Sequence, residues 1–304
     1  MLRITQHRRV FYVFSGILMA ASLAAWLLWG LKPGIDFTGG SMMEIEFSKG
    51  RPTVAEVSSA ASASIGSKET GVQPLGESSM VLRMPPLEET AHRKLSADLK
   101  AAFEKDGDTL TEKRFESIGP VIGEELRKNT VYAVVAAILA IVFYITYVFR
   151  KVSYPVASWK YGVSTIVALC HDVVIPVGVF SALGHFMGVE VGAWVVTALL
   201  TVLGFSVHDT IVVFDRIREN LSHAHREGFE EVVNRSMNET IGRSVNTSLT
   251  VLLVLIVTYV FGGESIKDFI LTMIIGIAAG TYSSIFVASP LLVSWQLRDE
   301  RARR

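Results

Sequence analysis

The sequence predicts an α-helical membrane protein that crosses the bilayer six times and carries one α+β domain outside it. Half of the 304 residues are hydrophobic. They gather in runs of about 20 residues with few charges, the length that crosses roughly 30 Å of hydrocarbon. Between residues 32 and 128 the composition changes to that of a soluble domain. The six predicted spans cover residues 11–31, 130–149, 161–186, 191–214, 245–261 and 269–292.

The first span shares one feature with a signal peptide, because basic residues precede its apolar run. The stretch WLLWGLKPGIDF follows where a small-residue cleavage pattern would stand in such a peptide. Trp26 and Trp29 suit the interface between lipid and water. We therefore expect residues 1–31 to form a cytoplasmic N-terminus and a retained membrane anchor.

Lysine and arginine in short connections indicate the orientation, because they are enriched on the cytoplasmic side. Residues 184–190 contain neither, and residues 262–268 contain only Lys267. The other short connections and both termini are basic, which places both termini in the cytoplasm and residues 32–128 on the outer face. Residues 298–304 then form a basic cytoplasmic tail. The basic residues are Arg3, Arg8, Arg9, Arg150, Lys151, Lys160, Arg216, Arg218, Arg226, Arg235, Arg243, Arg298, Arg301, Arg303 and Arg304.

The segment from residue 32 to about 128 has the pattern of a ferredoxin-like domain. Its order is strand, helix, strand, strand, helix, strand, which is typical of that split α+β fold. Thr53 and Glu56 predict a capping box at the start of the first helix. We expect His92, on a charged helix, to be a solvated surface residue. The predicted elements cover residues 41–47, 52–65, 71–76, 79–84, 86–105 and 109–118.

Residues 129–297 are predicted to form a bundle of five membrane helices that contains a polar segment at 216–243. The apolar residues of this segment share one helical face, which predicts an amphipathic helix at the cytoplasmic interface. The one cysteine, Cys170, lies in the third span, so no disulfide forms within the chain. The apolar face consists of Phe229, Val232, Val233, Met237 and Ile241.

Several motifs follow one another along this topology. GIDFTGG at 34–40 comes after the first span, and ALCHD at 168–172 lies in the third. TVLGFSVHDTIVVFDRIREN at 201–220 lies in the fourth. The fifth and sixth spans carry NRSMNETIGRSVNTS at 234–248, FGG at 261–263 and GTYSSIFVASP at 280–290. Together and in this order they resemble the SecF family, a subunit family of the SecD–SecF complex of bacterial protein export. The resemblance is weakest in the external domain.

The resemblance implies one six-span half of a resistance-nodulation-division (RND) bundle in the bacterial cytoplasmic (inner) membrane. It implies that SecD supplies the other half, beside the SecYEG translocon, and that a translocating preprotein is the client. Protons would be the coupling ion, with no further cofactor and no enzymatic reaction. The chain departs from the family at His208, where Asn is usual, and at Ser244, where Thr is expected.

Asp209 is the first candidate for chemistry. It lies about 9 Å inside the cytoplasmic boundary at Asp215, at 1.5 Å per residue, and ionisable residues inside membranes are functional candidates by default. Removal from water disfavours a charged carboxylate, whereas a nearby cation favours it. Arg243, at a similar depth in the fifth span, is the expected partner, and the resemblance points to the same pair. The pair is either a proton-binding switch or a static link between spans.

Asp172 lies nearer the middle of its span, so it either belongs to the same proton relay or stays protonated and hydrogen-bonded. His208 either titrates near neutral pH beside Asp209 or replaces a polar residue silently. His171–Asp172 and His208–Asp209 also suggest a metal site, but neighbours in a helix point about 100° apart and chelate poorly together. We expect no metal.

Glycines mark two further positions. In GIDFTGG, Gly34, Gly39 and Gly40 allow backbone angles that other residues avoid, and Asp36 can satisfy backbone donors in the turn. The motif is either a structural junction or a hinge to the external domain. The spacing of Gly276 and Gly280 in GIAAG predicts close packing between helices.

The formal net charge of +0 argues against nucleic acid as the main partner. The leading hypothesis is a proton-driven motor for protein translocation. Three alternatives remain open: an exporter of lipids or small hydrophobic molecules, an intramembrane hydrolase, and a structural scaffold for the translocon. A single six-span half requires a partner subunit or a second copy.

Overall fold

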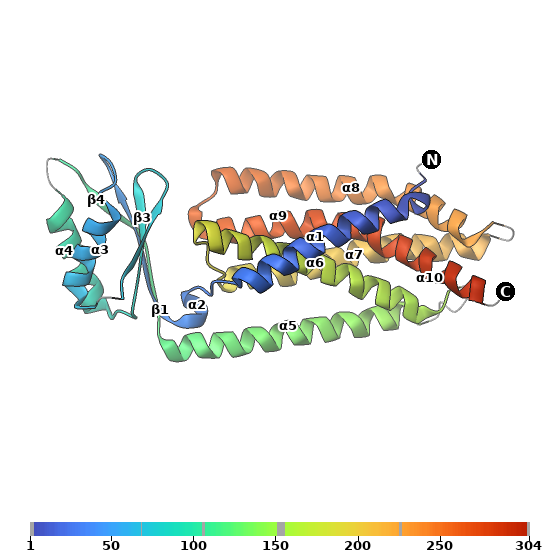
Figure 1. Cartoon of the computed structure of the whole chain (residues 1–304), viewed down its shortest axis with the longest axis horizontal. Helices are drawn as coiled ribbons and strands as arrows, with labels where there is room; N and C mark the ends of the chain where they lie inside the picture. Colours follow the sequence, from blue (N-terminus) through green and yellow to red (C-terminus); the bar gives the residue numbers. More distant parts are fainter. Residues whose placement is uncertain (1–2, 68, 105–106, 151–155, 225–226, 303–304) are drawn as a thin grey trace. The chain divides into compact units, whose positions relative to one another are not determined.

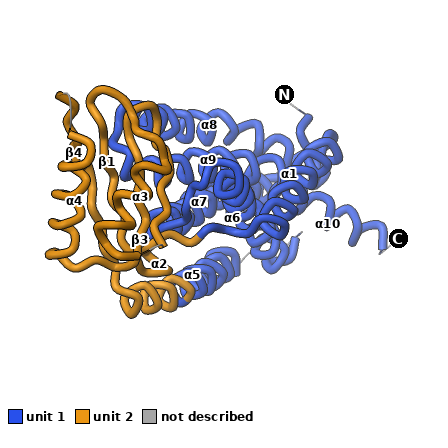
Figure 2. Tube along the Cα trace, turned by 60° about the vertical axis from the view of Figure 1, so that its left-hand side comes forward, with its two compact units in different colours: residues 1–32, 132–304 blue, residues 33–131 orange. Residues whose placement is uncertain are grey.

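The computed structural model describes residues 3–67, 69–104, 107–150, 156–224 and 227–302 (Figure 1). Lys151, Arg226, Arg303 and Arg304, which contribute to the predicted orientation, lie outside the described residues. The chain divides into two compact units, which Figure 2 colours separately. Unit 1 comprises Met1–Lys32 and Tyr132–Arg304, and unit 2 comprises Pro33–Val131.

Unit 2 contains a four-stranded antiparallel sheet with the strand order β2-β3-β1-β4. The sheet and its two helices confirm the predicted ferredoxin-like order. A four-residue helix, α2 (Ile35–Thr38), precedes the first strand. The elements that follow are β1 (Gly40–Phe47), α3 (Val54–Ile65), β2 (Gly71–Leu75), β3 (Ser79–Met84), α4 (Glu89–Phe103) and β4 (Leu110–Ile118).

The core of unit 2 follows from alternation in the strands. Every second residue of β1 and β3 is buried, and these side chains pack with the apolar faces of α3 and α4. Thr53 caps α3 through the predicted reciprocal bonds with Glu56. Pro74 is tolerated because β2 is an edge strand. The buried core comprises Met43, Ile45, Phe47, Val57, Ala61, Met80, Leu82, Met84, Leu95, Leu99 and Leu110.

His92 differs from the prediction of a solvated residue. Its ring stacks on Phe115 at a centroid distance of 3.7 Å, and its Nε2 lies 2.9 Å from Glu112 Oε1. The charged residues around His92 on α4 indicate a solvated position, but its partners come from β4 and not from the same helix. The sequence of α4 alone therefore does not reveal them.

Unit 1 is a helical bundle, and the chain has six helical segments long and apolar enough to cross a membrane within its described residues. This confirms the six predicted spans. The helices are α1 (Arg8–Trp29), α5 (Pro120–Phe149), α6 (Ser158–Met187), α7 (Ala193–His223), α8 (Phe229–Phe261), α9 (Lys267–Ser283) and α10 (Ser289–Ala302). The beginning of α5, up to Val131, belongs to unit 2. A π-helical turn, η3 (Ser284–Ala288), joins α9 to α10, and two short 3-10 turns are η1 (Thr5–His7) and η2 (Glu264–Ile266).

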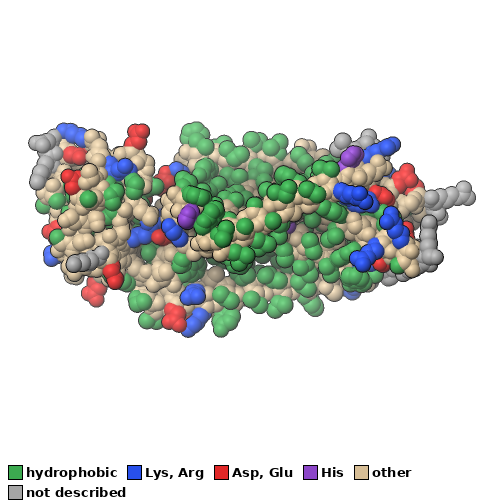
Figure 3. All heavy atoms as spheres, in the orientation of Figure 1, with side chains coloured by type: hydrophobic (Ala, Val, Ile, Leu, Met, Phe, Trp, Pro, Cys, Tyr) green, Lys and Arg blue, Asp and Glu red, His purple; other side chains and the backbone are tan. Residues whose placement is uncertain are grey.

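Burial divides these spans into a centre and a periphery. In α6, α7 and the last span, 44%, 44% and 56% of the most apolar window is buried, against 6% in α1, 6% in α5 and 11% in α8. Figure 3 shows apolar side chains covering much of the visible face along the helices. Continuous apolar surface of this extent is unusual on soluble proteins. The exposed helices therefore fit a surrounding of lipid.

The polar segment at residues 216–243 is not a separate surface helix. Residues 216–223 end α7, and residues 229–243 begin α8. The apolar side chains of Phe229, Val233 and Met237 join the buried core beside Phe214 and Ile217. The predicted apolar face is real, but it packs on the neighbouring helix and not on the membrane surface.

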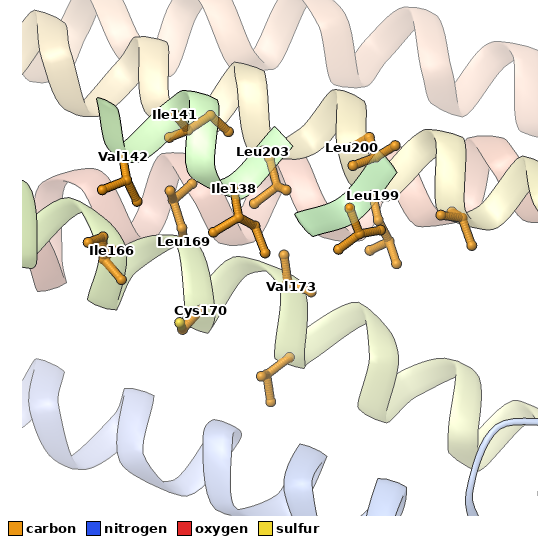
Figure 4. A pocket seen from close by; sticks show the side chains of 13 residues that line it. Ile138, Ile141, Val142, Ile166, Leu169, Cys170, Val173, Leu199, Leu200 and Leu203 are labelled. Carbon is orange, nitrogen blue, oxygen red and sulfur yellow. The ribbon is translucent and has the colours of Figure 1, made fainter. Parts of the chain in front are cut away.

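The C-terminal end of α5 packs on the bundle. Phe149 stacks on Tyr161 at 5.2 Å and meets Phe214 edge-on at 5.9 Å. Nearer the middle of α5, between Val134 and Val142, a cavity of about 230 Å³ lies between α5 and the helices α6 and α7 (Figure 4). Its lining is entirely apolar apart from the sulfur of Cys170, so it offers no strong hydrogen-bonding group to a polar ligand.

Candidate functional site

Two carboxylates are buried in the centre of unit 1, on adjacent helices. Asp172 of α6 is 0% exposed and Asp209 of α7 is 3% exposed. Burying a charge is costly unless it is paired or hydrogen-bonded. Their surroundings therefore show how each carboxylate is accommodated.

Asp172 accepts hydrogen bonds from three side chains. Ser283 Oγ of α9 donates to Oδ2 at 2.8 Å, and Ser206 Oγ of α7 donates to the same oxygen at 2.5 Å. His171 Nδ1 lies 2.9 Å from Oδ1. Both oxygens of the Asp172 carboxylate therefore have partners, as buried polar groups require. Asp172 is thus fixed where three helices meet.

Asp209 has weaker partners. Thr281 Oγ1 of α9 donates to its Oδ2 at 3.3 Å, and Ser248 Oγ of α8 donates at 3.5 Å. The two hydroxyls lie 2.5 Å from each other, so each also has an alternative partner. Asp209 is therefore held less firmly than Asp172, and a change in its protonation breaks fewer short bonds.

Thr210, which follows Asp209 in α7, makes contacts toward the surroundings of Asp172. Thr210, next to Asp209, donates to the carbonyl of Ser206, the residue that binds Asp172. Thr210 Oγ1 also lies 2.8 Å from Ser284 Oγ. Ser284 begins the π-helical turn in the last span, and such turns occur frequently at functional sites.

Gly276 and Gly280 allow α9 to approach α7 closely. A Cβ atom on Gly276 would lie 2.4 Å from Val202 Cγ2, and one on Gly280 would lie 3.0 Å from Ser206 Cβ. Both distances are shorter than ordinary carbon contacts. The absence of side chains at these positions brings Ser283 and Thr281 within reach of the carboxylates.

The structure does not bring Arg243 to Asp209. Arg243 is exposed on α8, and no ion pair within the described ranges includes it. His208 is likewise exposed, and its side chain projects about 100° around α7 from that of the neighbouring, buried Asp209. The hydroxyls that bind the two carboxylates include two that the sequence did not single out, Ser248 and Thr281. Ser248 was detectable as a residue four positions after Ser244, on the face away from Arg243.

Exposed polar and small residues follow one face of α7 and one face of α8 at membrane depth. In α7 they recur every three or four residues, and in α8 they begin at Arg243. Such residues in membrane spans usually face a protein interior and not lipid. We call this surface the polar face; it consists of Thr197, Thr201, Gly204, His208, Arg243, Thr247 and Thr250.

The GIDFTGG motif folds within unit 2. The carbonyl of Gly34 accepts bonds from the backbone of Phe37 and Thr38, which starts α2, while Asp36 lies in its first turn. Gly39 and Gly40 have φ angles of +72° and +128°, where glycine is favoured. Gly34 has φ −75°, so its conformation does not require glycine. A Cβ on Gly39 would lie 2.9 Å from Pro120 Cα, which explains the close join to α5.

Within the described residues, no group of three or more His, Cys, Asp or Glu is placed to hold a metal ion. His171 Nε2 is buried and has no hydrogen-bond partner there. The His-Asp pair of α6 is instead tied into the serine network around Asp172.

Comparison with known families decides the classification. Residues 98–298 match the C-terminal model of the protein export membrane proteins SecD and SecF. Residues 30–50, which contain GIDFTGG, match the SecD/SecF GG motif. The chain belongs to the SecD/SecF family. With its six apolar helices, it is a multi-pass membrane protein.

Relatives of this family match the chain over nearly its full length. The protein translocase subunit SecF of Thermobaculum terrenum is 44% identical over 98% of this chain and 95% of the relative. That of Escherichia coli O157:H7 is 36% identical over 94% and 85%. SecDF of Thermus thermophilus is 36% identical over 94% of this chain but 38% of its own length.

The SecD/SecF fold is also found in solved structures. The crystal structure of SecDF from Thermus thermophilus, a translocon-associated membrane protein, matches 97% of this chain with a TM-score of 0.81 and 32% identity. A second SecDF structure, in a super-membrane-facing form, matches 99% with a TM-score of 0.69 and 33% identity. The chain spans about two fifths of each SecDF chain, 39% and 40%. The six-helix half with its α+β domain is thus the shared part.

Proposed function

We propose that the chain is a SecF-type subunit that works with SecD beside the SecYEG translocon and uses the proton-motive force to promote the translocation and release of preproteins. The observation that carries the proposal is Asp209, a carboxylate that is 3% exposed and bound by two long hydroxyl contacts. Membership in the SecD/SecF family supports the role in protein export.

SecD is the proposed partner for the polar face. SecDF of Thermus thermophilus contains a region similar to this chain within a much longer chain, so a further segment accompanies the same six-helix half there. Polar residues exposed to lipid are unfavourable, and cover by membrane helices of SecD removes that cost. Arg243 and His208 then lie at the interface of the two subunits, where a change in their position can reach Asp209.

The proposed orientation places both termini in the cytoplasm and unit 2 on the outer face. It rests on the basic connections between spans. With this orientation, unit 2 meets the preprotein as it leaves the translocon. Gly39 and Gly40, at the start of β1, are the proposed junction through which movement of the spans reaches unit 2.

In the proposed mechanism, Asp209 gains a proton from one side of the membrane and loses it to the other. Protonation removes the charge that Ser248 and Thr281 solvate, so α7, α8 and α9 settle in a different packing. Asp172 keeps its three donors and serves as the fixed point of the bundle. One proton contributes about 2.3 kcal/mol per 100 mV, which shifts a two-state equilibrium by about 50-fold.

The apolar cavity gives little support to the alternative of exporting a hydrophobic molecule. Its volume of about 230 Å³ is below the roughly 300–1,000 Å³ that is usual for ligand pockets. A substrate site of that class also needs a few polar groups to orient the ligand, and the cavity lining has none beyond the Cys170 thiol.

The test replaces Asp209 by Asn in the chain co-purified with SecD and reconstituted with the translocon. We expect the stimulation of late export by an imposed proton gradient to disappear, while export without the gradient continues. Asp215→Asn is the matched control, because it makes the same change on the same helix at an exposed carboxylate paired with Arg218. Gradient-dependent stimulation at the wild-type level in Asp209→Asn would refute the proposal.

A further inference from the structure

Four buried hydroxyl groups follow one face of α8, one per helical turn. They belong to Ser236, Thr240, Ser244 and Ser248, and the residues are at most 7% exposed. Residues four apart in a helix share a face, so these hydroxyls form a line about 18 Å long. We call it the hydroxyl file. It faces α7 and α9, which both pack on α8 (Figure 1).

The hydroxyl file connects a buried carboxylate to an exposed one. At one end, Ser248 Oγ donates to Asp209 at 3.5 Å. At the other end, Asn220 Nδ2 donates to Ser236 Oγ at 2.9 Å and to Glu239 Oε2 at 2.8 Å. The Glu239 side chain is 33% exposed and also binds Arg216. The file therefore runs from the interior of the bundle to a group that water reaches.

The middle of the hydroxyl file contains an unpartnered group. Ser244 Oγ is buried and has no hydrogen-bond partner within the described part of the chain. Thr240 and Ser236, by contrast, donate to backbone carbonyls of their own helix. A buried hydroxyl without a partner is unfavourable. The unpaired hydroxyl of Ser244 therefore indicates a small bound ligand that can form hydrogen bonds both as donor and as acceptor.

The spacing of the hydroxyl file identifies that ligand. Hydroxyls four residues apart are separated by about 6 Å along the helix, too far for a direct bond between oxygens of about 2.8 Å. A single water between two hydroxyls makes two such bonds and spans about 5.5 Å. Buried polar groups of this kind are commonly satisfied by water.

We propose that the hydroxyl file binds a chain of water molecules that carries protons between Asp209 and the exposed end at Glu239. Each water accepts a proton from one neighbour and donates another to the next, so a proton released by Asp209 is matched by one delivered to water at Glu239. The proposal rests on the proposed proton role of Asp209. It adds the route by which protons pass between Asp209 and the water-exposed end of the bundle at Glu239.

The test compares Ser244→Thr with Ser244→Val, two side chains of nearly equal shape of which only threonine keeps the hydroxyl. The chain and its SecD partner are reconstituted into vesicles with a trapped pH dye, and proton entry is driven by a membrane potential. We expect Ser244→Thr to conduct like the wild type and Ser244→Val to lose about five- to tenfold, the effect of one hydrogen bond. The control is Thr258→Val, which removes a hydroxyl of α8 outside the file that bonds to Val254.

Two further measurements separate the possible failures. Asp209→Asn with wild-type flux would overturn the proton role itself. Flux that depends on Asp209 but is equal in Ser244→Val and Ser244→Thr would overturn the hydroxyl file alone. Ser244→Ala adds a measurement that does not depend on proton flux, the melting temperature Tm of the protein. If no water were bound to the Ser244 hydroxyl, its removal would eliminate an unpaired buried group and raise Tm. A raised Tm in Ser244→Ala would contradict bound water, and an unchanged or lowered Tm would support it.

Discussion

Replacing Gly276 by alanine tests the close packing of α9 on α7. The new Cβ would lie 2.4 Å from Val202 Cγ2 and 2.6 Å from Cγ1, whereas ordinary contacts begin at 3.4 Å. Val202 is 0% exposed, and its branched side chain has one strongly preferred rotamer in a helix. The helices must therefore separate by about 1 Å at this point, the difference between the two distances.

The magnitude follows from two opposing effects. Overpacking of this kind costs about 1–3 kcal/mol, whereas glycine to alanine in an open helix position gains about 0.5–1 kcal/mol. Gly16 on α1 supplies the matched control, since a Cβ there meets nothing within 4 Å. We expect Gly276→Ala to be less stable than Gly16→Ala by about 1–3 kcal/mol. Separation would also stretch the 3.3 Å contact between Thr281 and Asp209.

The assay is unfolding of the purified protein in mixed micelles by increasing SDS, followed by loss of helix signal. A double variant with Val202→Ala removes both γ-carbons that the new methyl meets. It should recover at least about 0.5 kcal/mol relative to the sum of the single variants, because the two sites are in contact. Equal stability of Gly276→Ala and Gly16→Ala, or strict additivity with Val202→Ala, would refute the packing argument.

Three other regions yield predictions of a different kind. Cys170 lines the apolar cavity and its side chain is exposed. In lipid the reactive thiolate hardly forms, so in vesicles thiol reagents should leave Cys170 unmodified until the protein is unfolded in SDS. Rapid modification in intact vesicles would contradict a lipid surrounding. Lys160 is 4% exposed and its Nζ donates to Asp299 Oδ2 at 2.6 Å. Asp299→Ala takes this partner from a buried cation and should destabilise the bundle by about 1–3 kcal/mol. Adding Lys160→Met should restore the stability, which SDS unfolding measures. Asp108 accepts bonds from the Ser48 hydroxyl and from three backbone N–H groups, which hold its pKa below the ordinary 3.8. Its contribution to the stability of unit 2 is present above pH 3.8 and is lost as the pH falls through the lower folded pKa. Asp108→Asn should therefore flatten the decline of Tm in this acid range, and an unchanged slope would exclude the contribution.

The interior of unit 2 was predictable because its signals are local. Alternation in β1 and β3, the capping box at Thr53 and the apolar spacing of α4 depend on neighbours a few residues away. The antiparallel order of the strands then follows from a common fold with short connections. His92 was misjudged because its partners, Phe115 and Glu112, come from a strand about twenty residues further along the chain.

The membrane bundle shows the same difference between local sequence signals and contacts between distant segments. The sequence alone determined the number of spans, their approximate limits and the presence of carboxylates at Asp172 and Asp209, because hydrocarbon requires about 20 apolar residues per crossing. It could not determine which hydroxyls meet those carboxylates. A helix offers residues in every direction, and a rotation of 100° separates Thr247 from Ser248. Only the packing of α7, α8 and α9, set by contacts such as Gly276 on Val202, turns Ser248 toward Asp209 and leaves Arg243 on the exposed face.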